Sequence, residues 1–79
     1  LNNILVFVNN DKLFVKGVED QVKALSITNM LGQNVKRYND VSYNVLKNGI
    51  DISGLSTGMY VVSLQTTNKL QHTQKVVKG

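Results

Sequence analysis

Residues 55–64 read Leu55-Ser56-Thr57-Gly58-Met59-Tyr60-Val61-Val62-Ser63-Leu64, and this segment is the strongest indication of the fold. It is a Leu-x-x-Gly-x-Tyr step that leads into a strand pattern, because Tyr60, Val62 and Leu64 share one face when side chains alternate. In two-sheet β-sandwiches, a tyrosine near the start of a late strand turns its hydroxyl back to the upstream backbone and fixes the corner between the sheets. We therefore predict that the Tyr60 hydroxyl bonds to backbone within residues 53–57 and that Gly58 has a positive φ.

Similar strand signals recur roughly every 8 to 12 residues, which is the spacing of sandwiches and barrels. The predicted extended segments are residues 4–8, 13–16, 22–28, 34–38, 43–47, 50–52, 59–67 and 70–78. Polar turns separate them, at Asn9-Asn10-Asp11, Glu19-Asp20-Gln21, Asn39-Asp40, and Asn48-Gly49, the last being a hairpin or loop signal. Val22 and Ala24 are out of phase with the apolar residues that follow, so we expect a β-bulge near Ala24 and Leu25.

The predicted fold class is all-β, with about seven antiparallel strands in two sheets, and a small barrel is the alternative. No segment of ten or more residues has a clean helical period, so we expect no helix longer than about one turn. The predicted core consists of Val6, Leu13, Val15, Leu25, Ile27, Val35, Ile52, Leu55, Tyr60, Val62 and Leu64.

Composition limits what the domain can bind. The 79 residues suffice for one domain, and the absence of cysteine excludes disulfides and thiolate metal sites. The formal net charge of +4 comes mainly from lysines that stand singly, with Lys36-Arg37 as the adjacent pair and no interleaved aromatic platform, which argues against nucleic acid. The longest apolar run, residues 4–8, is too short to cross a bilayer, so no direct membrane insertion is expected.

Few residues suggest chemistry. His72, the one histidine, lies in a polar stretch and is expected to be an exposed strand residue. Asp40 and Asp51 are a conceivable carboxylate pair that nothing in the sequence brings together, and Asn9-Asn10-Asp11 lacks the spaced ligands of a calcium loop. We therefore predict no catalytic, cofactor-binding or metal-binding residue, and a binding, structural or addressing module in place of an enzyme.

Several motifs in order along the chain carry a resemblance to a known family. Residues 25–35 contain a strand, an Asn-x-x-Gly-Gln turn with Gly32 and Gln33 as its structural residues, and a following Val35. Residues 50–64 contain the Leu-x-x-Gly-x-Tyr step, and residues 74–79 read Gln-Lys-Val-Val-Lys-Gly. These features resemble the C-terminal sorting domains of the type IX secretion system of Bacteroidota, the Por secretion system sorting signals. Many members open with Pro-Asn-Pro, whereas residues 1–4 here contain no proline and resemble a subtype that starts directly with a strand.

The resemblance implies an immunoglobulin-like sandwich at the C-terminal end of a larger exported protein. The chain begins without an initiator Met, and we expect residues 1–79 to be a single sorting domain cut from such a protein. The implied partners are the outer-membrane translocon, its β-barrel shuttle protein and a sortase-like cysteine peptidase that usually removes the domain. The implied route is through the periplasm to the cell surface or the medium. The candidate residues for translocon recognition are Gly58, Tyr60, Lys75, Val76, Val77 and Lys78.

Two other functions are compatible with the residues alone. A carbohydrate-binding or adhesive immunoglobulin-like module would need an exposed aromatic platform, for which Tyr38 and Tyr43 are the candidates. A structural spacer domain would need no recognition residues.

Overall fold

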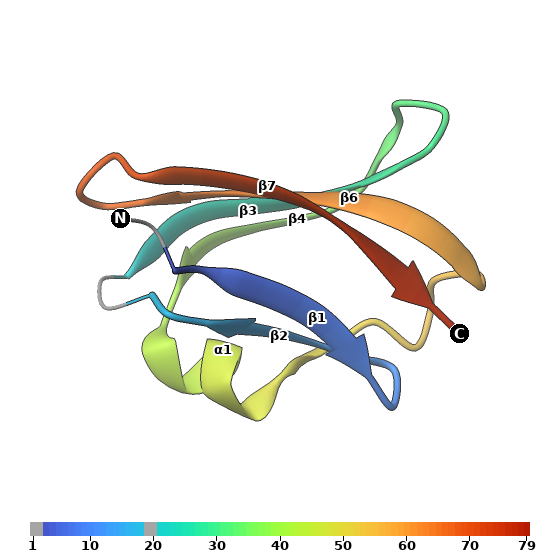
Figure 1. The fold of residues 1–79 in the computed structure, drawn as a ribbon, viewed down its shortest axis with the longest axis horizontal. Coiled ribbons are helices and arrows are strands. Elements are labelled where there is room, and N and C mark those ends of the chain that lie inside the picture. Colours follow the sequence, from blue (N-terminus) through green and yellow to red (C-terminus); the bar gives the residue numbers. More distant parts are fainter. Residues whose placement is uncertain (1–2, 19–20) are drawn as a thin grey trace.

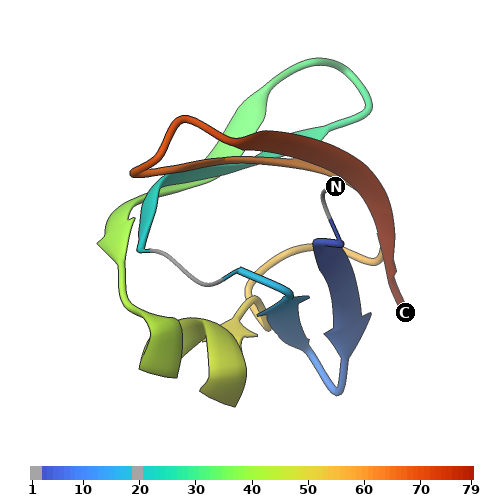
Figure 2. The same ribbon diagram turned by 60° about the vertical axis from the view of Figure 1, so that its left-hand side comes forward.

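The computed structural model describes residues 3–18 and 21–79, and it consists of two packed antiparallel sheets (Figures 1 and 2). One sheet has the order β1-β2-β5 and contains β1 (Leu5–Asn9), β2 (Lys12–Lys16) and β5 (Ile50–Asp51). The other has the order β4-β3-β6-β7 and contains β3 (Val22–Asn29), β4 (Asn34–Val41), β6 (Gly58–Thr66) and β7 (Gln71–Lys78). A short helix, α1 (Tyr43–Asn48), packs beside β2.

This strand order is that of an immunoglobulin-like sandwich. With the letters used for immunoglobulin domains, β1, β2 and β5 are strands A, B and E, and β4, β3, β6 and β7 are C′, C, F and G. The predicted sandwich is confirmed, and the two separate sheets exclude the alternative of a barrel. The corner tyrosine of this class lies between strands E and F, which is where Tyr60 lies near the start of β6.

The core lies between the two sheets and matches most of the prediction. Every predicted core residue is buried except Val35 and Leu55, which are partly buried and pack against its margin. The buried hydrophobic residues outside the predicted core lie in or next to the strands and in α1, and they are Ile4, Val18, Val22, Val41, Leu46, Ile50 and Val76.

The prediction of an extended segment at residues 43–47 is wrong, because this segment forms α1. The Ser42 hydroxyl accepts a hydrogen bond from the Val45 N–H at 3.4 Å, and the Gly49 N–H donates to the Val45 carbonyl at 3.0 Å. Asn48-Gly49 therefore ends a helix and makes no hairpin. Six residues form nearly two turns, more than the single turn expected. Leu46 is the one buried residue of the helix, and a single buried side chain leaves no helical period to detect.

The predicted break at Asn39-Asp40 is also wrong. Strand β4 continues to the buried Val41, which pairs with Val22, and Asp40 lies within it at φ +52°. The predicted bulge is confirmed within a residue, since the register of β3 against β6 shifts between Val22 and Ala24. Residues 19–20, which fall in a predicted loop, lie outside the described residues, as do residues 1–2.

Candidate recognition site

The terminal strand β7 divides the candidate residues between two faces. Val76 and Lys78 are buried on the face toward the core, whereas Lys75 and Val77 are exposed on the outer face, Val77 at 61%. From the sequence, these four residues were expected to form one recognition element. The structure brings only Lys75 and Val77 to the surface.

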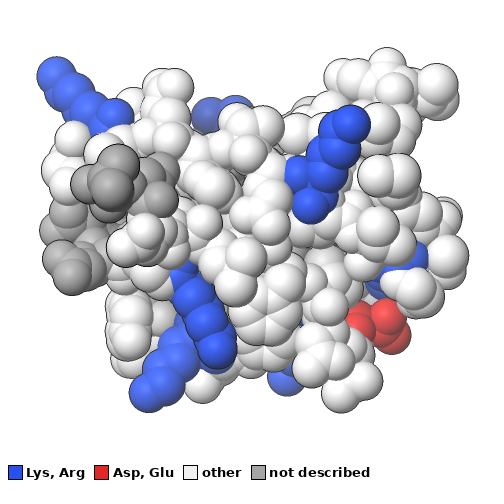
Figure 3. Space-filling view, viewed as in Figure 1, with Lys and Arg blue, Asp and Glu red and all other residues white. Residues whose placement is uncertain are grey.

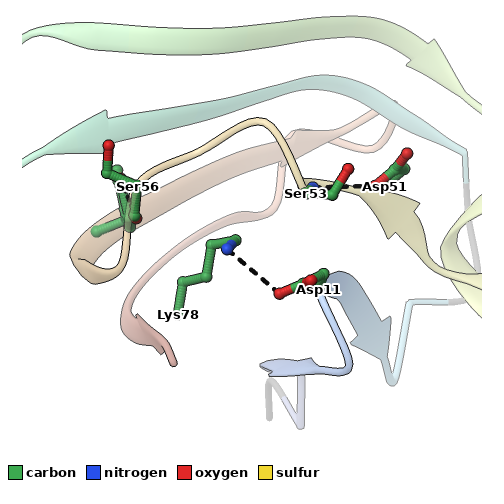
Figure 4. A network of polar contacts seen from close by, with 6 residues as sticks. Asp11, Asp51, Ser53, Ser56 and Lys78 are labelled. Atoms are coloured by element: carbon green, nitrogen blue, oxygen red, sulfur yellow. Dashed lines mark hydrogen bonds and ion pairs between the residues drawn. The ribbon is translucent and has the colours of Figure 1, made fainter.

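Lys78 is a buried cation with a structural partner. Its Nζ lies 3.2 Å from Asp11 Oδ1 (Figure 4), and the side chains of Lys78 and Asp11 are 8% and 52% exposed. Asp11 lies in the turn between β1 and β2, where Asn10 and Asp11 both have positive φ, as in a type I′ hairpin turn. A charge withdrawn from water requires a partner. The ion pair therefore ties the end of β7 in one sheet to a turn of the other.

Tyr60 and Gly58 form the predicted corner. The Tyr60 hydroxyl donates a hydrogen bond to the Ser56 carbonyl at 2.7 Å, which confirms the corner. Gly58 has φ +153°, a value that residues with a Cβ rarely adopt. The Leu55 N–H donates to the Ile52 carbonyl at 3.0 Å and tightens the same loop. Because Tyr60 is buried, its side chain cannot contact a partner directly, and its role is to fix the conformation of the corner.

A polar turn precedes this corner. Asp51 Oδ1 accepts a hydrogen bond from the Ser53 N–H at 2.9 Å (Figure 4). Hydrogen bonds from Ser53 lower the pKa of the Asp51 carboxyl, and the charges of Lys12 and Lys36 add to that effect. On β4, burial raises the pKa of the Tyr38 hydroxyl, and the negative charge of Asp51 raises it further.

Four side chains form an exposed surface over the corner end of β6 and β7. This outer patch consists of two cross-strand pairs, Met59 with Val77 and Val61 with Lys75. Met59 is exposed and Val61 is partly exposed. Met59 and Val61 were not among the predicted recognition residues, although the alternation that places Tyr60 and Val62 inside also places these two outside.

The turn at residues 29–33 is held by its own side chains. Gly32 has φ +85° and its N–H donates to the Asn29 carbonyl at 3.0 Å, while Gln33 Oε1 accepts from Asn29 Nδ2 at 3.0 Å. Asn29 pairs with Tyr60, and Tyr60 pairs with Val76. The turn, the corner and the end of β7 therefore share one end of the sandwich, at the right of Figure 1.

His72 has a structural environment and is half-buried, not exposed as predicted. Its Nε2 lies 2.9 Å from Gln74 Oε1, and the Gln74 amide bonds to both the N–H and the carbonyl of Val6, at 3.1 and 2.7 Å. Because an amide oxygen only accepts, the His72 Nε2 carries the hydrogen of that bond. Gln74 thus joins the two sheets at the edge of β1.

No other constellation in the described part of the chain suggests catalysis or metal binding. Among residues 3–18 and 21–79, no three His, Asp or Glu side chains gather in a way that could hold a metal ion. Of the two tyrosines considered for a carbohydrate platform, Tyr43 is exposed on α1 and Tyr38 is half-buried against the core. Basic side chains are spread over the face in Figure 3, and the acidic atoms visible there lie in one place beside a basic side chain.

A comparison with protein families gives the same reading as the motifs. The model of the family described as the secretion system C-terminal sorting domain matches residues 8–79. The chain belongs to this family. The sorting domain is therefore a C-terminal signal for type IX secretion, and the carbohydrate-binding alternative is not favoured.

The match begins within β1, so the opening residues, which lack Pro-Asn-Pro, lie outside the matched range. A search of curated proteins gave no match to the sorting domain. Within the described residues, no helix has the length and hydrophobicity needed to cross a membrane.

Proposed function

We propose that the secretion machinery recognises this sorting domain in its folded state, at the end of the sandwich where its motifs meet. The observation that supports this is the cross-strand row of Asn29, Tyr60 and Val76, which brings together three segments that are distant in the sequence. A sorting signal must act independently of the protein that carries it. A sandwich that folds by itself and carries its recognition motifs at one end satisfies that requirement.

The proposed partners are the outer-membrane translocon and its β-barrel shuttle protein. Lys75, Val77 and Met59 of the outer patch make the side-chain contacts, because they are exposed on an edge strand and its neighbour. Edge strands are frequent docking elements. Gly58, Tyr60, Val76 and Lys78 act indirectly, by fixing the corner and the position of β7.

The fate of the domain follows from the same proposal. The domain crosses the periplasm with its cargo and reaches the cell surface or the medium. It is a substrate of a sortase-like cysteine peptidase and has no catalytic activity of its own. The hydrogen bond between His72, its one histidine, and Gln74 supports this part of the proposal.

The test is an export assay with point variants. The domain is fused behind a signal peptide and a fluorescent reporter in a host with this secretion system. We expect the native domain to deliver the reporter to the surface or medium. The double variant Lys75→Glu/Val77→Ser should retain it in the periplasm and lower export by about tenfold or more, the effect of losing about 1.4 kcal/mol of binding free energy. Protease resistance of the retained protein shows that the domain is still folded.

The control is Gln71→Glu, which also places a carboxylate on the outer face, at the other end of β7. It changes the net charge by −1, against −2 for Lys75→Glu. Normal export of the control and loss with Lys75→Glu/Val77→Ser support recognition at the outer patch. Equal export of both variants would contradict it. Deletion of residues 75–79 is a poorer test, because it removes the buried Val76 and the Lys78–Asp11 ion pair and so perturbs folding.

A further inference from the structure

The connection between β3 and β4 presents two apolar side chains to solvent. Met30 is 55% exposed and Leu31 is 84% exposed. This hairpin tip, residues 29–33, projects beyond the two sheets in both ribbon views (Figures 1 and 2). The core does not use either side chain, and the outer patch does not include them.

Hydrogen bonds within the hairpin tip hold its backbone in one conformation. Asn29 Oδ1 accepts hydrogen bonds from the N–H groups of Leu31 and Gln33, both at 3.0 Å. The Asn29 N–H donates to the Gln33 carbonyl at 2.9 Å, and the Gly32 N–H donates to the Asn29 carbonyl at 3.0 Å. Because these bonds already order the backbone of the tip, binding through Met30 and Leu31 costs little further backbone entropy.

The same hydrogen bonds lower the cost of burying the hairpin tip against another protein. The N–H groups of Leu31, Gly32 and Gln33 all have acceptors within the tip. A buried donor without a partner is costly, and these three donors keep their partners when a protein surface covers them. The tip can therefore be desolvated without new hydrogen bonds to those groups.

We propose that Met30 and Leu31 form a two-residue plug that enters an apolar socket on a receptor protein of the secretion machinery. This inference rests on the proposed function, and it adds a second contact beside the outer patch. Asn29 pairs with Tyr60, the neighbour of Met59, so one receptor surface can reach both sites. Because residues 29–35 carry no charge, the socket has an uncharged polar rim around an apolar floor, the anatomy of a binding hot spot.

The charge and size of the hairpin tip favour a receptor protein as its partner over a membrane surface or a second copy of the domain. Segments that bind membrane surfaces combine a larger apolar face with lysine or arginine, and the tip has two apolar residues and no basic one. A stable dimer buries about 800 Å² on each partner, more than a five-residue tip supplies alone. The proposed function also places its receptor protein at this end of the sandwich.

The test compares export by three variants that keep the turn-forming residues. Met30→Ser/Leu31→Ser removes both apolar side chains. Met30→Leu/Leu31→Met keeps the apolar character of the plug. Leu70→Ser removes a half-exposed apolar residue next to the β6–β7 turn, at the other end of the sheet.

We expect the serine double variant to keep the native urea midpoint and to lose at least tenfold in export, because each apolar contact contributes about tenfold or more in affinity. We expect the exchanged variant and Leu70→Ser to export like the native domain. Native export by the serine double variant would overturn the plug hypothesis. The proposed function is tested separately, by whether the unmodified domain is exported at all.

Two measurements on the purified domain address the other occupants. We expect no binding to vesicles that contain anionic lipid, and a monomer in sedimentation velocity at concentrations up to 100-fold apart. Vesicle binding that the serine double variant abolishes would replace the receptor with a lipid surface. A dimer that the same variant dissociates would replace it with a second copy.

Discussion

The ion pair between Lys78 and Asp11 gives the sharpest prediction about the terminal strand. If Lys78 stabilises the fold, an uncharged side chain of similar shape should replace it with little loss of stability. A variant that keeps Lys78 but removes its partner Asp11 should lose more stability. The perturbation is a double-mutant cycle with Asp11→Asn, Lys78→Met and the combination of the two.

The geometry sets the expected magnitude. For two unit charges at 3.2 Å, Coulomb's law gives about 5 kcal/mol at an effective dielectric constant of about 20, and about 1.3 kcal/mol in bulk water. Lys78 is largely enclosed and Asp11 is half exposed, so we expect a coupling energy of about 2 kcal/mol. Asp11→Asn should cost about 2 to 3 kcal/mol, because it strands a buried cation. Lys78→Met should cost less than about 1 kcal/mol, because it removes the charge together with its desolvation penalty.

The assay is urea unfolding of the four proteins at pH 7, at low salt and in 1 M NaCl. A coupling energy below about 0.3 kcal/mol, typical of a weak surface pair, would refute a structural role for the ion pair. Export of Lys78→Met provides the functional readout. A Lys78→Met domain that is stable but not exported would show that a receptor reads the ammonium group itself.

Three other predictions concern the corner. Tyr60→Phe should lower the free energy of unfolding by about 1 kcal/mol, because it removes the hydrogen bond to Ser56. Tyr60→Ala should lower it by about 3–5 kcal/mol, because it also empties core volume. Unchanged urea midpoints would contradict a stabilising role for the corner. Gly58→Val should become protease-sensitive and remain in the periplasm, because a β-branched residue resists φ +153°, whereas Gly54→Val, at a site with open space and no positive φ, should stay resistant to protease. Asp51 has a lowered pKa in the folded state, so its stabilisation is present above about pH 4 and is lost as the pH falls through that lowered pKa. Asp51→Asn should therefore be less stable than the native domain at pH 7, and the difference in stability should shrink in acid. Parallel stability curves between pH 2 and 7 would disprove a stabilising role for the Asp51 carboxylate.

The sequence alone determined the fold class and the family. Alternation placed Tyr60, Val62 and Leu64 on one buried face, because strand geometry is set by neighbouring residues. The corner was predictable for the same reason, since its donor Tyr60 and its acceptor Ser56 are four residues apart. The short helix α1 escaped prediction although Ser42 and Gly49 are ordinary capping residues, because only Leu46 within it is buried.

The role of each residue in the terminal motif depends on contacts between segments that are distant in the sequence. Residues 75–78 read as one basic and apolar run, yet Lys78 turns inward to Asp11, a partner from the other end of the chain. The convergence of the hairpin tip, the corner and β7 likewise depends on pairing through β6, and Gln74 reaches Val6 across the two sheets. Such long-range contacts depend on which strands become neighbours, and local residue patterns do not contain that information.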